Sequence, residues 1–427
     1  MSVDPTLDPD QLVANARAET GLSEFDEPDI EGPLRILTRA LREEARLTPG
    51  GRYFWSGRLH GILVTRLRGR DWVRRHPEIL EERVPPPLVI LGLSRTGTTL
   101  LHRLIAADKR FYSAAWWECR FPVPAPDDMD GAKRIAVAKA EVAAMLEANP
   151  DLLSIHPFDA MGADEDILLM DQTLLSTTSE TMACIPGYYE WLRTQDLRPA
   201  YDYWYRTIQL LQWQKRRRGA TAERWVLKTP MHLGHVDKIV DIFPDATFAQ
   251  THRDPVATIP SYASMIYELW RGVGETSDPV EAGRETSGTL EHDLNRCLAV
   301  REIHRHRLPR HRQGPRERRR ADLPPHRTAD DGHCATPDRR VHEFAPARGP
   351  SETRVLDGAV RVHARRHRAP LCRVQEAAYR ALGATLDHAP HGVTLRRRRE
   401  GGLSSSRGSG FDGLRISRAP ERARVRY

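Results

Sequence analysis

The chain has 427 residues, of which 29% are charged and 40% hydrophobic, and its formal net charge is +7, so its length allows one large domain or several small ones. It has no run of about 18 apolar residues and no basic and apolar leader, so we expect no membrane-spanning helix, no secretory signal and a cytoplasmic location. The five cysteines are widely spaced without a CxxC pair, and they indicate neither a disulfide framework nor a zinc site.

The first predicted element is a helical segment over residues 1–84. Its apolar residues recur at the three- and four-residue spacing of an amphipathic helix. They include Leu34, Leu37, Leu41, Leu59, Leu63 and Leu67. The three prolines at 85–87 end this segment, because proline lacks the backbone N–H that a continuing helix needs.

The next region, residues 85–300, alternates strands with helices. Strands are expected at 88–91, 224–227 and 246–251, and helices follow them near residues 98, 232 and 256. Further helices are expected at 132–148, 164–180 and 196–218, within a helical insertion over residues 127–220. This alternation predicts an α/β, P-loop-like three-layer fold with a central parallel sheet.

The loop after the first strand carries the strongest chemical signal in the chain. Gly92 to Thr99, with the sequence GLSRTGTT, has the glycine spacing of a P-loop, and Thr98 stands where a P-loop ATPase has its lysine. The glycines let backbone N–H groups point at one phosphate, and the N-terminus of the next helix attracts the same anion. Arg95 supplies a positive charge in the loop, which the missing lysine would otherwise provide. We therefore predict a phosphate-binding loop, and the missing lysine counts against a P-loop kinase or nucleotide phosphotransferase.

This loop and its flanks, from Pro87 to Leu104, resemble the 5′-phosphosulfate loop of sulfotransferases that use 3′-phosphoadenosine 5′-phosphosulfate (PAPS). The likeness is greatest to the bacterial branch that has Arg-Thr-Gly-Thr-Thr at this place. It extends over roughly residues 6–300 and implies PAPS as the co-substrate, with cationic side chains and loop amides in place of a metal. The residues that it assigns to the 5′-phosphosulfate are Arg95, Thr96, Gly97, Thr98 and Thr99.

The resemblance implies a second phosphate-binding element farther along the chain. In this family a strand ends in an arginine, a serine follows eight residues later, and both bind the 3′-phosphate. Arg253, in THRDP, and Ser261 match that spacing. Two such elements suit a donor with a phosphate group at each end. The structural alternative is an arginine at a helix cap and a serine facing the core.

The catalytic candidates are one lysine and two glutamates. Lys228, in VLKTP, follows a predicted strand, and the resemblance implies that it stabilises charge on the bridging oxygen of the sulfuryl donor. The acceptor hydroxyl needs a general base. For this role we rank Glu118, in WWECR, before Glu165, in ADED, and both before His102. The structural alternatives are a solvated lysine for Lys228, a carboxylate at a helix N-terminus for Glu165 and a packing or capping histidine for His102.

The expected reaction is transfer of a sulfuryl group from PAPS to a hydroxyl group of a small-molecule or lipid acceptor. Aromatic residues are concentrated over positions 188–213. They form either a helix core or an apolar acceptor pocket, and both alternatives stay open.

Residues 301–427 differ from the rest of the chain in composition. They hold 30 Lys+Arg, all of them Arg, and 14 Asp+Glu, a charge of +16, whereas residues 1–300 hold 35 and 44, a charge of −9. No Trp, Asn or Met occurs there, and we expect disorder because little apolar surface can offset chain ordering. One interpretation is an Arg-rich tail that makes this a nucleic-acid-binding protein. The interpretation that we favour is a reading-frame shift near residues 300–305 in GC-rich coding DNA.

Overall fold

The computed structural model describes residues 5–148, 153 and 156–307, and those up to Glu302 belong to one compact unit. The two interpretations of residues 301–427 cannot be compared with the structure from residue 308 on, because residues 308–427 lie outside the described residues.

The N-terminal part of the chain is helical, as the apolar periodicity predicts. Its elements are α1 (Pro9–Thr20), α2 (Glu31–Glu43), α3 (Pro49–Arg75) and the short 3-10 helix η1 (Pro77–Ile79). The side chains of Asp8 and Thr48 cap α1 and α3 by accepting hydrogen bonds from backbone N–H groups of the first turns. The buried leucines of these helices share one hydrophobic core with the strands that follow.

A parallel four-stranded sheet forms the centre of the α/β part. Its strands are β1 (Leu88–Leu91), β2 (Phe111–Tyr112), β3 (Arg224–Lys228) and β4 (Thr247–Gln250), in the order β2-β3-β1-β4. All three pairings are parallel. Three of these strands are predicted from the sequence, whereas β2 is too short to give a pattern. The register brings the carboxyl ends of β1, β3 and β4 to one edge of the sheet, where ligands of open α/β sheets bind.

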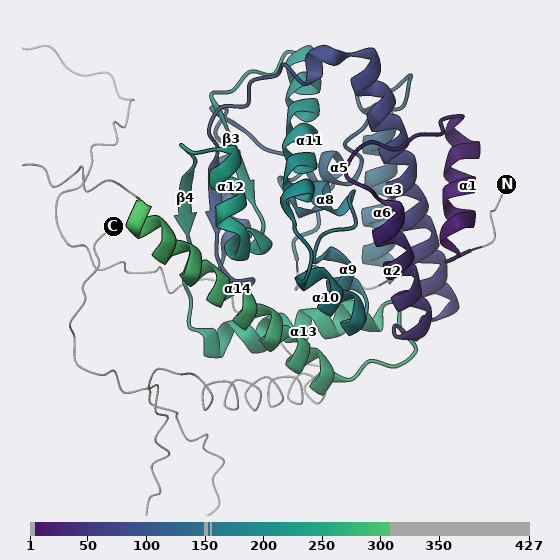
Figure 1. Cartoon of the computed structure of the whole chain (residues 1–427), viewed down its shortest axis with the longest axis vertical. Coiled ribbons are helices and arrows are strands. Elements are labelled where there is room, and N and C mark those ends of the chain that lie inside the picture. The colour runs from purple at the N-terminus through teal and green to yellow at the C-terminus, as the bar shows by residue number, and fades with distance from the viewer. Residues whose placement is uncertain (1–4, 149–152, 154–155, 308–427) are drawn as a thin grey trace, which may run out of the picture. The chain divides into compact units, whose positions relative to one another are not determined.

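Helices cover both faces of the sheet, so the predicted three-layer α/β fold is confirmed. On β3, the indole of Trp225 donates a hydrogen bond to Gln212 of α11 (Arg198–Arg217). The side chain of Lys228 instead reaches Thr99 of α4 (Thr98–Ala106). Residues an odd number apart on a strand point to opposite faces, and α11 and α4 therefore lie on opposite sides of the sheet. Figure 1 shows β3 and β4 at the left of the described part of the chain and the N-terminal helices α1, α2 and α3 at the right.

The helical insertion agrees with the sequence in part. Helix α6 (Ala132–Ala148) has the predicted bounds. The helix predicted over 164–180 is wrong, because two short helices, α8 (Ile167–Asp171) and α9 (Thr178–Met182), take its place. Between them Leu174 has a φ of 56°, which no α-helix accommodates.

The remaining helices complete the shell around the sheet. They are α5 (Trp116–Arg120), α10 (Pro186–Arg193), α12 (Val236–Ile242), α13 (Pro255–Arg271) and α14 (Pro279–Arg307). The single helix predicted over 232–243 is divided into the 3-10 helix η2 (Pro230–His235) and α12. Pro230 at the start of this stretch follows the edge of the sheet that carries the candidate site.

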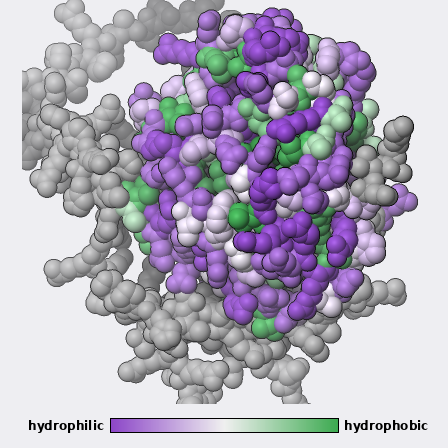
Figure 2. Space-filling model, turned by 45° about the vertical axis from the view of Figure 1, so that its right-hand side comes forward, coloured by the Kyte–Doolittle hydropathy of each residue, from purple (hydrophilic) through white to green (hydrophobic). Residues whose placement is uncertain are grey.

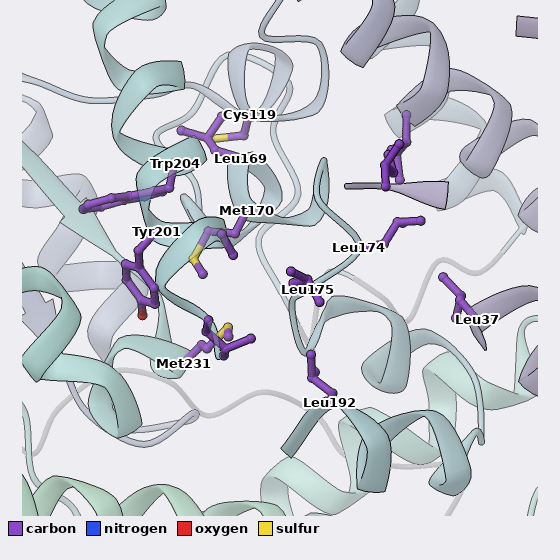
Figure 3. Close-up of a cluster of buried hydrophobic side chains, with 14 of the residues drawn as sticks. Leu37, Cys119, Leu169, Met170, Leu174, Leu175, Leu192, Tyr201, Trp204 and Met231 are labelled. Carbon is purple, nitrogen blue, oxygen red and sulfur yellow. The ribbon is translucent and has the colours of Figure 1, made fainter. Parts of the chain in front are cut away.

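The surface and the interior differ sharply in polarity. The face in Figure 2 is mainly hydrophilic, with small separate hydrophobic areas. The interior contains a continuous cluster of aliphatic and aromatic side chains, part of which Figure 3 shows around Met170, Tyr201 and Trp204. Within the described residues, no helix is both long enough and apolar enough to cross a membrane.

Candidate functional site

The loop from Gly92 to Thr99 is wound by residues with positive φ. Gly92 has a φ of 146°, and a Cβ there would lie 2.4 Å from the hydroxyl of Thr251, so only glycine fits. Gly97 has a φ of 89° and is the N-cap of α4. Arg95 has a φ of 69°, which is uncommon for a residue with a side chain. Such a succession of turns points backbone N–H groups to one concave side, which is how anion-binding nests are built.

The hydroxyl groups of the loop have two different environments. Thr96 donates its hydroxyl to the carbonyl of Leu93 at 2.7 Å and contacts the hydroxyl of Thr251 at 2.6 Å. This hydroxyl therefore ties the loop to the end of β4. Thr98 is buried and Thr99 is partly exposed at the first turn of α4, where backbone N–H groups lack partners within the helix.

Lys228 and Glu165 meet at the first turn of α4. The ammonium of Lys228 donates to Glu165 Oε1 at 2.6 Å and to Thr99 Oγ1 at 3.1 Å. The hydroxyl of Thr229 donates to the other carboxylate oxygen of Glu165 at 3.3 Å. The side chain of Lys228 is 0% exposed and that of Glu165 is 24% exposed. The buried ammonium of Lys228 thus contacts a partly exposed carboxylate, and both lie beside the loop from Gly92 to Thr99, which we call the phosphate loop after its predicted role.

Asp166, the residue after Glu165, holds the backbone of Lys228 in place. Its Oδ1 accepts the backbone N–H of Lys228 at 2.7 Å, and its own N–H donates to the carbonyl of Lys228 at 3.3 Å. Its Oδ2 accepts the indole N–H of Trp204 at 2.7 Å and contacts Nε2 of His232 at 2.7 Å. The hydroxyl of Tyr201 lies 3.0 Å from Nδ1 of His232. Burial opposes the charge on Asp166, but His232 and these hydrogen bonds keep the pKa of the carboxyl below its usual value.

Buried aromatic side chains pack around Asp166. Tyr201 and Trp204 come from successive turns of α11, with ring centroids 5.7 Å apart, and both are buried. Figure 3 shows the ring of Trp204 above that of Tyr201, with Met231 of η2 below Tyr201. The helix α11 and the segment after β3 therefore hold Asp166 between them, and Asp166 holds the backbone of Lys228.

The second predicted element lies at the start of α13. The side chain of Asp254 caps this helix, and Arg253 precedes it. Nη1 of Arg253 donates to the backbone carbonyl of Arg95 at 3.1 Å. Nε of Arg95 in turn donates to the hydroxyl of Ser261 at 3.2 Å. The structure therefore brings Arg95, Arg253 and Ser261 into one group beside the phosphate loop.

Glu118 does not join either group. It is buried on α5, where Oε2 contacts Nζ of Lys215 at 2.5 Å and Oε1 accepts from Arg218 at 2.8 Å. Oε2 also accepts the backbone N–H of Ala115 at 3.0 Å. These partners belong to α5 and to the end of α11, not to the phosphate loop. The local sequence WWECR gives no signal that separates a carboxylate paired in the interior from one that lies at the loop Gly92 to Thr99.

His102 lies on α4 behind the phosphate loop and is buried. Burial, assisted by the nearby ammonium of Lys228, lowers the pKa of its imidazole to about 4. The imidazole is therefore neutral at neutral pH and packed into the interior, whereas Glu165 is the candidate base that solvent reaches.

The low pKa of His102 leads to a prediction about stability. The unfolded chain takes up this proton near pH 6.5 and the folded protein only near pH 4, so the free energy of unfolding falls as the pH drops through this window. We expect a loss of about 2 kcal/mol from this group between pH 7 and pH 5. Urea unfolding at both pH values measures it. His102→Phe should remove that part of the loss, and an unchanged pH dependence in this variant would contradict the assignment.

Comparison with known proteins identifies the family. The pattern of the sulfotransferase family matches residues 86–314, more than half of the chain. The chain belongs to the sulfotransferase family. This family member is also 30% identical over 191 residues to the omega-hydroxy-beta-dihydromenaquinone-9 sulfotransferases Stf3 of Mycobacterium bovis and Mycobacterium tuberculosis. That stretch is 44% of this chain and 46% of theirs, so the chain matches about half the length of these curated relatives.

Two crystal structures of sulfotransferases are similar to the chain in fold. The first is sulfotransferase STF1 from Mycobacterium tuberculosis, with a TM-score of 0.61 and 30% identity over 70% of this chain and 82% of that one. The second is sulfotransferase STF9 from Mycobacterium avium, with a TM-score of 0.62 and 27% identity over 71% of this chain and 78% of that one. Both support the α/β sulfotransferase fold.

Three residues of the site have no signal of their own in the sequence. Asp166 is part of the acidic run ADED, which also suits the N-terminus of a helix. His232 lies in a stretch whose pattern predicts an ordinary amphipathic helix. Trp204 is one of many aromatic residues on α11. Only their meeting at the end of β3 indicates that they act together.

Proposed function

We propose that the protein transfers a sulfuryl group from PAPS to a hydroxyl group of an acceptor molecule. The observation that carries this proposal is the group formed by Lys228, Glu165 and Thr99 at the N-terminus of α4. It combines a cation, a base and a phosphate-binding loop within hydrogen-bonding distance. A second cationic group at the start of α13 suits a donor with phosphate groups at both ends.

In the proposed reaction, Glu165 accepts the proton of the acceptor hydroxyl. The acceptor oxygen attacks the sulfur in line, and the bond between sulfur and the bridging oxygen breaks. The products are the sulfate ester of the acceptor and adenosine 3′,5′-bisphosphate, which keeps the electron pair of the broken bond. Lys228 and the N–H groups of the loop stabilise the charge that develops on the bridging oxygen. Glu165 must release Lys228 as the donor binds, and its partial exposure permits this movement.

A lipid alcohol is the acceptor class that we propose. Leu100 and Leu104 follow Thr99 at helical spacing on α4 and are 67% and 64% exposed. Met161, a few residues before Glu165, is also exposed. Large apolar side chains beside a polar site suit an acceptor with an apolar body. The Stf3 relatives are named as sulfotransferases of an omega-hydroxy-beta-dihydromenaquinone-9, which is a menaquinone with a hydroxyl group.

Calorimetry with adenosine 3′,5′-bisphosphate tests the donor site directly. We expect the full chain to bind this product, and Arg253→Ala to weaken binding by about 10- to 100-fold, because a charge-assisted contact to the 3′-phosphate is lost. Arg271→Ala, an exposed arginine at the other end of α13, is the matched control and should bind normally. Failure of the wild type to bind, or magnesium-dependent turnover of ATP in its place, would reject the proposal.

A further inference from the structure

A second pocket is enclosed by the helices α9, α10, α13 and α14, which Figure 1 shows in the lower part of the described chain. Three aromatic side chains line it, those of Tyr189 on α10 and of Tyr262 and Trp270 on α13. Glu180 of α9 and Thr286 of α14 line the same space. The indole of Trp270 donates to the backbone carbonyl of Glu180 at 2.9 Å, which ties the aromatic wall to the helix that carries the carboxylate.

Two polar atoms at this pocket are buried and lack a hydrogen-bond partner. They are Oε2 of Glu180 and Oγ1 of Thr286, to which no group in the described part of the chain is bonded. Thr286 is only 3% exposed. Most buried polar groups of folded proteins have a partner, and two such atoms beside one space therefore indicate a ligand that both can contact.

The charge of Glu180 is not offset by an ion pair. Burial raises the pKa of its carboxyl well above the usual value, and the nearby Asp293 and Glu285 act in the same direction. The cation of Arg193 opposes this effect, but its guanidinium packs on the ring of Tyr189, 4.1 Å from the centroid. A buried carboxylate is costly without a paired charge. The carboxyl of Glu180 therefore needs either a proton or a bound cation beside it.

The lining of the pocket selects one kind of cation. Aromatic rings attract a cation that lies over their faces, and tryptophan does so most strongly. A metal ion requires several charged or oxygen ligands, and no group of three or more His, Cys, Asp or Glu side chains suits one among the residues that the structure describes. The space holds about two water-sized groups. An ammonium group fits this space, carries N–H donors for both unpartnered oxygens and leaves room for a short carbon chain.

We propose that this pocket binds the ammonium group of a small primary amine. The nitrogen donates to Oε2 of Glu180 and to Oγ1 of Thr286, and its charge interacts with the surrounding rings. The proton that Glu180 holds in the absence of the amine leaves to solvent. This inference does not depend on the proposed function, because the pocket shares no residue with the group formed by Lys228, Glu165 and Thr99.

Thermal unfolding of the full chain in ethylammonium chloride tests the proposal, with the dissociation constant measured by calorimetry. At 100 times this constant, a ligand that binds only the folded protein raises the ratio of folded to unfolded molecules by about 100-fold, and the melting temperature rises. Sodium chloride at the same concentration is the control for ionic strength. Tetramethylammonium chloride should act like sodium chloride, because this larger cation has no N–H to donate to Glu180.

Variants of the two polar residues test the contacts. Glu180→Gln should weaken binding of ethylammonium by at least about tenfold, and Thr286→Val by about 3- to 10-fold. Glu291→Gln changes an exposed glutamate of α14, is the matched control and should bind like the wild type. Melting temperatures without the amine verify folding of each variant. Equal affinity in the wild type and in both pocket variants, or equal stabilisation by ethylammonium, tetramethylammonium and sodium chloride, would overturn the proposal.

Discussion

Replacing Glu165 with glutamine is expected to lower kcat for sulfuryl transfer by about 10²- to 10⁴-fold, the range that general bases contribute. Glutamine keeps the size of the side chain and can still accept a hydrogen bond from Lys228 through its amide oxygen, but it cannot take up the proton of the acceptor. Binding of adenosine 3′,5′-bisphosphate should change by less than about threefold, because neither phosphate group of the product requires this carboxylate.

Glu118→Gln is the matched comparison, since both glutamates are candidates from the sequence. We expect this variant to keep its turnover per folded molecule and to lose stability by about 3 kcal/mol, because Lys215 and Arg218 are left beside a neutral side chain in the interior. Steady-state kinetics and urea unfolding of both variants decide the matter. The opposite pattern, with an active Glu165→Gln and an inactive but stable Glu118→Gln, would transfer the role of base to Glu118.

The parts of the site that depend on neighbouring residues in the chain can be predicted from the sequence. The turn from β1 through the loop Gly92 to Thr99 into α4 is such a part, because the spacing of Gly92 and Gly97 and the apolar strand before them are local. Apolar runs and helical periodicity likewise locate β1, β3, β4 and most of the long helices. The strand β2 is not predicted from the sequence, because it has only two residues and its position depends on pairing with β3.

The choice between the carboxylates depends on contacts between distant segments. Glu165 reaches Lys228 only because Asp166 exchanges hydrogen bonds with the backbone of Lys228, 62 positions away. The carboxylate of Glu118 is paired with Lys215 and Arg218 only because α11 ends beside α5. The break before α9 has a similar origin, since Asp171 pairs with Arg58 of α3 in the interior. None of these pairings leaves a periodic or motif-like trace in the sequence.

The direction of the Arg95 side chain is also a tertiary property. The motif predicts that the residue is cationic and lies in a phosphate loop, which is a statement about sequence position. Its hydrogen bond to Ser261, 166 positions later, depends on its left-handed backbone and on how the loop packs beside α13. A motif can therefore predict the type of residue at a position without predicting the contacts of its side chain.

Replacing Lys228 with methionine is expected to lower kcat by about 10²- to 10³-fold, the loss that follows removal of one group that stabilises developing charge. The side chain of Lys228 is fully buried, so its aliphatic part packs in the core and only its ammonium reaches Glu165 and Thr99. Methionine fills a similar volume without the charge. Glu165 keeps contact with solvent and with Thr229, and we therefore expect a folded protein.

The lysine variants are compared by steady-state turnover of PAPS with a lipid alcohol and by calorimetry with adenosine 3′,5′-bisphosphate. Lys109→Met removes an exposed ammonium just after α4 and serves as the control for loss of charge alone. It should leave kcat unchanged. Lys228→Arg should recover little activity, because the planar guanidinium does not fit a buried cavity shaped for an ammonium. If Lys228→Met retains turnover and loses only stability, the buried lysine is a structural partner of Glu165, and charge stabilisation must come from the loop amides.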